Sequence, residues 1–239
     1  MNKQLIGSTL LSTFIVIGCA NNNYQQESSR GYGQNSGAIS APIHSSTTSN
    51  QSTTINGSHK IKNSLIYMYE EERLAKEVYL AIYAKQPVRQ LSKIASGAEV
   101  RHIDAVKKMA SHYGVTTPYQ QAGKYNIASI QTLYNNLYAK GIRSKKDALE
   151  VGCMVEVVDI NDLNNYINEA QSANAQDVLQ TYNFLRKGSY NHYWAFDRGL
   201  KQMGVSDGCC SLGQEYCHPE YPQKEQGHGR GQGQGRGWR

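Results

Sequence analysis

Runs in which β-branched and polar residues alternate are scarce in this sequence, which argues against a β-sheet as the main element. The apolar run near the start is too short to cross a membrane comfortably as a helix. The five cysteines form no Cys-x-x-Cys pair, so the metal sites built on that spacing are excluded. What remains is a long region of helical periodicity between two ends of low complexity, and 239 residues therefore indicate one folded domain.

The first residues have the pattern of an export signal. The segment "MNKQLIGSTLLSTFIVIGCANNN" contains Lys3, a short apolar run and then Val16-Ile17-Gly18-Cys19. These last four residues resemble a bacterial lipobox, so we expect residues 1–18 to be a lipoprotein signal peptide and Cys19 to be lipidated. The acyl chains would hold the protein to a membrane, because each buried methylene contributes about 0.8 kcal/mol. The alternative is an ordinary signal peptide with an incidental cysteine.

The residue after this cysteine bears on location. Ala20 follows Cys19, and no aspartate is there to favour retention in an inner membrane. We therefore expect an exported lipoprotein of the cell envelope, in the outer membrane if the organism has one.

Both ends of the chain are poor in large apolar residues. Residues 19–62 are rich in Asn, Gln, Ser, Thr and Gly, and we expect a disordered tether there. Residues 206–239 are expected to be a tail that contains cysteines and then Gly, Arg and Gln. Such tails occur in nucleic-acid-binding proteins, but an exported protein rarely meets nucleic acid. With a net charge of +6, a solvated tail loosely attracted to acidic lipid or polysaccharide is the preferred interpretation.

Residues 63–205 are predicted to form an all-α domain of four main helices, at 63–86, 90–113, 144–171 and 174–203. Pro87 ends the first helix, while Gly114 and Gly204 follow the second and fourth. Ser144 and Asp147 give the third helix a start that resembles a capping box. The long link between the second and third helices has a helical pattern of its own at 128–139, and it lets the chain cross from one end of a bundle to the other.

Each predicted helix carries polar residues on its apolar face, at the helical step of about 100° per residue. On the first helix Glu72 points inward, Glu71 lies at the margin of the apolar face and Glu70 faces solvent. The other inward groups are Glu99 and His102 on the second helix, Glu156 and Asp159 on the third, and Ser189 and His192 on the fourth.

A metal site explains this pattern better than separate accidents do. A lone inward His is usually a hydrogen-bonded core residue, and a lone inward Glu usually pairs with Arg or Lys. Four helices with such groups, one bearing an E-x-x-H spacing, are harder to obtain by chance. Grouped carboxylates repel one another unless cations neutralise them, and a set of carboxylates and imidazoles suits iron or manganese.

The segments "EEERLAKEVY", "AEVRHIDAV", "ALEVGCMVEVVDINDL" and "GSYNHYWAF" resemble an uncharacterised bacterial and archaeal family within the ferritin-like group, a domain of unknown function. The resemblance implies a ferritin-like four-helix bundle with one long crossover between helices 2 and 3. Ferritin-like di-metal proteins use one Glu from each of two helices and an E-x-x-H pair from each of the other two. By that pattern the metal ligands are Glu72, Glu99, His102, Glu156 and His192.

The sequence departs from that pattern at Ser189, which stands where the second pair should have its glutamate. Asp159 or water could fill the position, or the site could hold one metal instead of two. If two irons bind, the resemblance implies peroxide or oxygen reduction or ferrous oxidation, with an external electron donor. The many tyrosines are interpreted as core packing instead of electron relay.

Four cysteines remain after Cys19. In an exported protein a disulfide from Cys217 to Cys209 or Cys210 is the first expectation, and a zinc or iron site there is the alternative. Two function classes stay open for the whole chain. One is a metal-dependent redox protein of the cell envelope, and the other is a non-enzymatic surface lipoprotein with a degenerate metal site.

Overall fold

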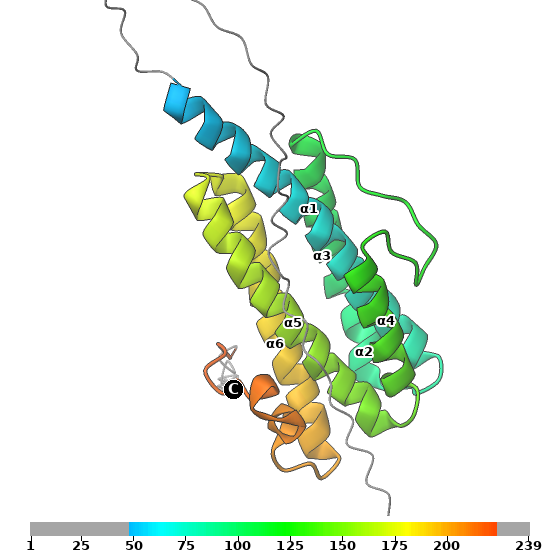
Figure 1. Ribbon diagram of the computed structural model, residues 1–239. Helices are drawn as coiled ribbons and strands as arrows, with labels where there is room; N and C mark the ends of the chain where they lie inside the picture. The colour runs from blue at the N-terminus through cyan, green and yellow to red at the C-terminus, as the bar shows by residue number, and fades with distance from the viewer. Residues whose placement is uncertain (1–47, 224–239) are drawn as a thin grey trace, which may run out of the picture. The chain divides into compact units, whose positions relative to one another are not determined.

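The computed structural model describes residues 48–223 (Figure 1). Side chains are described from residue 57 to residue 223. The predicted signal peptide, the lipidation site Cys19 and the end of the Gly/Arg/Gln-rich tail lie outside the described residues. In the described part the protein is all-α, with helices and no strands. None of its helices combines the length and the hydropathy that a membrane span requires.

Six α-helices follow one another within residues 48–223. They are α1 (Thr48–Tyr83), α2 (Arg89–Ala95), α3 (Ala98–His112), α4 (Ala128–Gly141), α5 (Lys145–Ser172) and α6 (Gln176–Gln202). Two short 3-10 helices, η1 (Gly208–Leu212) and η2 (Gln214–Tyr216), follow α6. Four of the helices contact one another in a closed order, α1 with α3, α3 with α6, α6 with α5 and α5 with α1.

Several helix ends lie where the capping residues and glycines of the sequence predict them. Ser144 is the N-cap of α5, and its hydroxyl accepts a hydrogen bond from the Asp147 amide at 3.0 Å. α3 and α6 end just before Gly114 and Gly204, as predicted. The helical pattern expected at 128–139 is α4.

The second predicted helix is not continuous. Residues 90–113 are divided into α2 and α3 by a break at Ser96 and Gly97. A Cβ atom at Gly97 would lie 2.9 Å from the Lys93 carbonyl oxygen, so only glycine fits this break without a shift. The break turns the chain between α2, which packs on α1, and α3, which carries Glu99 and His102.

Both predicted boundaries of the helical domain need correction. α1 begins at Thr48, inside the stretch 19–62 that was expected to be a disordered tether. Ile61, at 1 % exposure, is buried in the core together with Ala170 and Val178, and this packing favours the longer helix. The domain also continues past 205, because the segment after α6 folds back onto α5 and α6 through η1 and η2.

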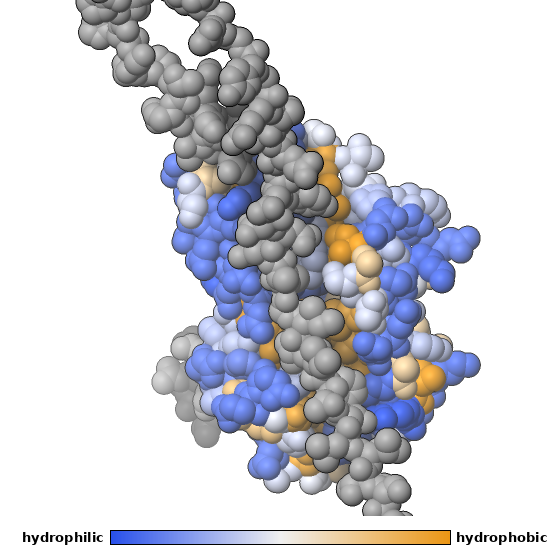
Figure 2. All heavy atoms as spheres, viewed as in Figure 1, coloured by the Kyte–Doolittle hydropathy of each residue, from blue (hydrophilic) through white to orange (hydrophobic). Residues whose placement is uncertain are grey.

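Among the described side chains, the core consists of two hydrophobic clusters. One contains Leu74–Ile82 of α1 with the first half of α5 and the second half of α6, and the other contains Ile61–Met68 with the opposite halves. Between the two clusters all four helices contribute buried polar side chains instead of apolar ones. On the face shown in Figure 2 the described surface is largely hydrophilic, with an interrupted band of hydrophobic side chains.

Candidate metal centre

The polar layer contains every metal ligand predicted from the sequence. It is made of Glu72 from α1, Glu99 and His102 from α3, Glu156 and Asp159 from α5, and Ser189 and His192 from α6. The most exposed of these residues, His192, has only 6 % of its surface accessible. Burying ionisable groups costs several kcal/mol unless they are paired or bind a cation.

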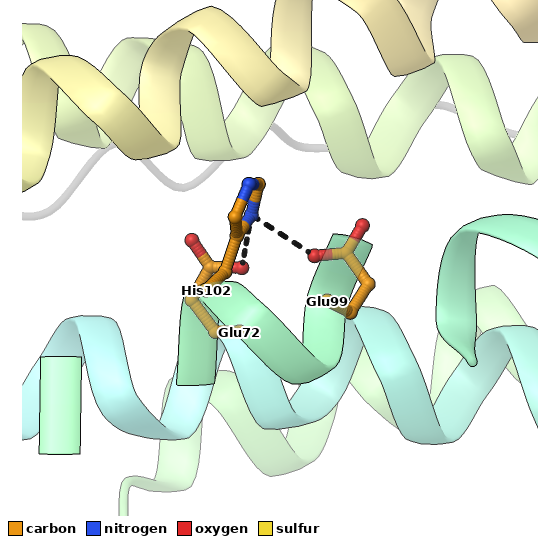
Figure 3. Close-up of side chains that lie close together, drawn as sticks. All are labelled: Glu72, Glu99 and His102. Carbon is orange, nitrogen blue, oxygen red and sulfur yellow. Dashed lines mark hydrogen bonds and ion pairs between the residues drawn. The ribbon is translucent and has the colours of Figure 1, made fainter. Parts of the chain in front are cut away.

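The first set of ligands joins α1 to α3. The Nδ1 atom of His102 lies 3.2 Å from Glu72 Oε2 and 3.2 Å from Glu99 Oε2. Figure 3 shows the three side chains pointing toward one another from the two helices. Glu99 and His102 are one helical turn apart, so the E-x-x-H spacing puts both on the same face of α3.

The second set joins α3 to α5 and α6. His192 Nδ1 lies 3.0 Å from Glu99 Oε1 and 3.4 Å from Glu156 Oε2. Within each set, one ligand atom of every residue lies within 4.8 Å of the others. Glu99 belongs to both sets and offers one oxygen to each, and the two histidine rings are 5.5 Å apart. The two sets could therefore each hold a cation, with Glu99 common to both.

Several atoms of the two sets lie close together without being oriented for hydrogen bonding, whereas His102 Nδ1 and Glu72 Oε2 are hydrogen-bonded at 3.2 Å. Although Glu99 Oε1 and His192 Nδ1 are 3.0 Å apart, neither atom has a partner in hydrogen-bond geometry among the described residues. The same holds for Glu72 Oε1, which is also buried. Unpartnered buried acceptors of this kind need a cation, a proton or a water. Carboxylate oxygens and imidazole nitrogens are suitable donors for iron and manganese.

Burial and mutual charge shift the pKa values of the layer in opposite directions. Burial raises the pKa of Glu72 to about 7, although His102 partly offsets it. Burial would also raise the pKa of Glu99, but His192 and His102 outweigh it and hold that pKa well below its usual range. Burial would lower the pKa of His192, but Glu156 and Glu99 raise it to about 10. Protons on the histidines thus balance the carboxylates where no cation is bound.

Asp159 is in the layer but in neither ligand set. The hydroxyl of Ser189 donates a hydrogen bond to Asp159 Oδ2 at 2.5 Å, while Asp159 Oδ1 has no partner among the described residues. Burial and the charges of Glu72 and Glu156 raise the pKa of Asp159 well above its usual value. Ser189, which stands in place of the expected glutamate, therefore holds the carboxylate of Asp159 from the neighbouring helix α5.

Two residues that matter to the site were missed in the sequence. Tyr79 is fully buried, and its hydroxyl donates a hydrogen bond to Glu156 Oε1 at 2.6 Å. Gly188 lets α6 approach the first ligand set, since a Cβ atom there would lie 2.3 Å from His102 Nε2. Tyr79 carried a signal, because it is seven residues after Glu72 and shares its face. Gly188 carried none, because it depends on the distance between α3 and α6.

The acidic triplet of α1 differs from the prediction at two positions. Glu70 was predicted to face solvent and is fully buried, because its carboxylate accepts hydrogen bonds from the Asn126 and Ile127 amides at the start of α4. Glu71 was placed at the margin and is 3 % exposed. The link between α3 and α5 folds over this part of α1, and a single helix pattern does not contain that information.

The cysteines form two disulfides in the described residues. Cys217 pairs with Cys210, one of the two partners expected for it, and Cys209 pairs with Cys153 of α5. The second bridge was not predicted. It fastens the segment after α6 to the helix that carries Glu156 and Asp159.

Comparison with known proteins places the chain among uncharacterised relatives. The uncharacterised protein MJ0754 of Methanocaldococcus jannaschii is 38% identical over 149 residues, which is 62% of this chain and 78% of that protein. The crystal structure of the hypothetical protein MJ0754 from Methanococcus jannaschii DSM 2661 aligns with a TM-score of 0.57 and 34% sequence identity, and the match covers 69% of this chain and 87% of that one. The model of the uncharacterized protein domain DUF2202 matches residues 61–217, so the chain belongs to that family.

Proposed function

We propose that this protein is a membrane-anchored, ferritin-like metal protein that binds iron or manganese inside its helical core. In this proposal α1, α3, α5 and α6 are the four-helix bundle, and the segment with α4 is the long crossover between the second and third of them. The lipid on Cys19 would hold the domain at the cell envelope. Bound iron or manganese would supply redox chemistry, such as the reduction of peroxide or oxygen or the oxidation of ferrous iron, with an external electron donor.

A single observation carries the metal proposal. Glu99 offers its two oxygens to two separate histidines, each of which faces a further carboxylate from another helix. A structural core has no need for this symmetry, because one hydrogen bond would satisfy each histidine nitrogen. Two cations with Glu99 between them would satisfy all of these atoms together.

Hydroxyl groups near such a centre would hold two of its carboxylates in place. Tyr79 fixes one oxygen of Glu156 and leaves the other, Oε2, facing His192. Ser189 fixes one oxygen of Asp159 and leaves the other without a hydrogen-bond partner. We propose that Asp159 supplies the carboxylate that the second E-x-x-H pair lacks, so that the two metal positions are unequal.

The runner-up is a non-enzymatic surface lipoprotein with a degenerate site. The favouring observation is again Ser189, which replaces a ligand and hydrogen-bonds Asp159 as it would in a purely structural core. In that case the layer holds protons on its histidines and has no affinity for metal.

Metal analysis of the full chain separates these functions. The protein is purified in detergent without a metal-affinity tag, loaded anaerobically with ferrous iron or Mn²⁺, and its metal content is measured by mass spectrometry. We expect up to one ion for each of the two ligand sets. Glu99→Gln should lose metal from both sets, whereas His102→Ala should affect mainly the first.

Asp104→Asn is the matched control, because Asp104 is an exposed acid on α3, the same helix as Glu99. It should leave the metal content unchanged. A wild-type chain that stays metal-free after loading, and melts at the same temperature with and without metal, would rule out the metal proposal and leave the runner-up.

A further inference from the structure

Glu71 is the unexplained group of the α1 and α5 interface. Its side chain is buried at 3 % exposure, and neither carboxylate oxygen has a hydrogen-bond partner among the described residues. It belongs to neither ligand set of the centre. A buried carboxylate without a donor is costly, so its position calls for a positive partner.

The register of the two helices identifies what faces Glu71. Tyr67 contacts Tyr166 at a ring-centroid distance of 5.7 Å, and Tyr79 reaches Glu156. Residue numbers thus rise on α1 while they fall on α5, so the two helices are antiparallel. Glu71 is four residues after Tyr67, and Asp162 is four residues before Tyr166. The register therefore places Glu71 opposite Asp162, one helical turn closer to the candidate metal centre than the tyrosine pair.

The two carboxyl groups lie against each other, close enough to share a hydrogen bond when one of them is protonated, and the Tyr67 hydroxyl lies beside Asp162. Both groups are acceptors when ionised, so they repel unless something binds between them. Asp162 is only partly buried, and it lies one turn of α5 after Asp159 of the polar layer, on the same face. The pair therefore leads from the surface side of the interface toward the centre.

A pocket opens one turn further out. It has a volume of about 430 Å³, and its lining includes both tyrosines of the pair together with Lys60 and Glu169. The two opposite charges at this pocket offset each other. On the side of the tyrosine pair that faces the candidate metal centre, the negative charge comes from Asp162 and Glu71.

We propose that Glu71 and Asp162 form a separate binding site for a divalent cation, located between this pocket and the metal centre, and that ferrous iron or Mn²⁺ occupies it on the way in. Two carboxylates with water in the remaining positions are a suitable ligand set for such an ion. The role in entry rests on the proposed function of the centre, but the binding of a cation between Glu71 and Asp162 does not.

The site is tested first by its occupancy. Crystals of the full chain are soaked in MnCl₂, and anomalous scattering is measured near the manganese edge. A peak between Glu71 and Asp162 is expected in the wild type and should be lost in Glu71→Gln and in Asp162→Asn. If the centre fills with manganese and this position shows no peak, a proton shared by the two carboxyl groups is the explanation and the proposal is wrong.

The role in entry is tested by the rate of loading. Stopped-flow mixing of the apoprotein with ferrous iron should show loading slowed by about 10-fold or more in Glu71→Gln and Asp162→Asn, since a lost charge lowers the local cation concentration. The final metal content of the centre should stay unchanged, as should the loading rate of Asp104→Asn. Unchanged rates in both interface variants would overturn the entry role.

Each outcome is assigned to one proposal. If the centre is empty and a peak lies between Glu71 and Asp162, the proposed cation site is supported. The proposed metal centre and the role of this site in metal entry are then both wrong. An empty centre without that peak removes both proposals. Glu71→Gln removes a buried charge that no donor binds, and Asp162 is only partly buried, so we expect both variants to fold, and circular dichroism checks this.

Discussion

At the scale of single residues, the candidate centre depends on buried carboxylates and imidazoles from four helices that lie close together. Glu99 is the clearest case, because its oxygens contact His102 and His192 at 3.2 Å and 3.0 Å. The surrounding residues hold this geometry from outside. Tyr79 and Ser189 each bind one oxygen of an α5 carboxylate, and Gly188 admits the His102 ring.

Gly188→Ala should weaken metal binding without unfolding the protein. The added Cβ atom would lie 2.3 Å from His102 Nε2, so the ring must leave its present position, in which Nδ1 faces Glu72 and Glu99. Displaced ligands of this kind typically cost about 10-fold to 100-fold in metal affinity. Equilibrium titration with Mn²⁺ in the presence of a competing chelator measures the change.

Gly141→Ala is the control for this variant. Its Cβ atom would lie 2.2 Å from Ile82 Cδ1, a comparable overpacking that involves no ligand and should cost about 1–3 kcal/mol of stability. We expect it to lower the melting temperature and leave the metal affinity within about threefold. Equal loss of affinity in both variants would mean that the effect of Gly188→Ala is general destabilisation.

At the scale of the elements, the segment after α6 is fixed to the bundle by a covalent bridge and by hydrogen bonds. The amide of Cys209 donates to Asp197 of α6 at 3.0 Å, and the Tyr193 hydroxyl donates to the Tyr216 carbonyl at 2.8 Å. The Cys153–Cys209 bridge closes a sequence separation of 56 residues, while Cys210–Cys217 closes only 7.

The two bridges should therefore contribute unequally to stability. Loss of loop-closure entropy predicts about 4 kcal/mol for the pair Cys153→Ser and Cys209→Ser, and about 2 kcal/mol for Cys210→Ser and Cys217→Ser. Urea unfolding of the two double variants under non-reducing conditions gives both values. Equal losses would show that the chain-entropy argument does not apply to this fold.

The start of α5 should make stability depend on pH. Burial would raise the pKa of Asp147, but hydrogen bonds from Ser144, Arg143 and Lys140 outweigh it and lower that pKa. A lowered folded-state pKa stabilises the fold above the unfolded value of about 3.9, and this contribution disappears as the pH falls through the folded-state value.

Asp147→Asn should therefore be less stable than the wild type near neutral pH, and the difference should shrink below about pH 4. Ser144→Ala removes the N-cap and should cost about 1 kcal/mol at neutral pH. Urea unfolding of each variant at several pH values checks both expectations. A difference for Asp147→Asn that grows toward acid pH would contradict the assignment.

At the scale of the whole molecule, the protein combines a helical domain with an N-terminal segment that we expect to anchor it. Cys19→Ser should move the protein from the detergent phase to the aqueous phase in a phase-partition assay, because lipidation requires the thiol. Ala20→Ser, which keeps the cysteine, is the control and should partition as the wild type does. Unchanged partition of Cys19→Ser would refute the lipid anchor.

Some features were determined by the sequence alone. Helix ends at Gly114, Gly204 and Ser144 follow from local backbone and capping chemistry, which a few neighbouring residues decide. The inward direction of Glu72, Glu99, His102, Glu156 and His192 follows from the helical repeat, because apolar neighbours on the same face fix which side is buried.

Tertiary structure decided the rest, because the remaining features depend on distances between segments far apart in the chain. The link before α4 covers Glu70, α5 lies against Glu71, and the bridge from Cys153 to Cys209 fastens the segment after α6 to α5. Only the packed helices show that Glu99 serves two histidines and that Asp159 is held by Ser189. A periodic pattern gives the face of a helix, whereas the partner across that face depends on register and distance between helices.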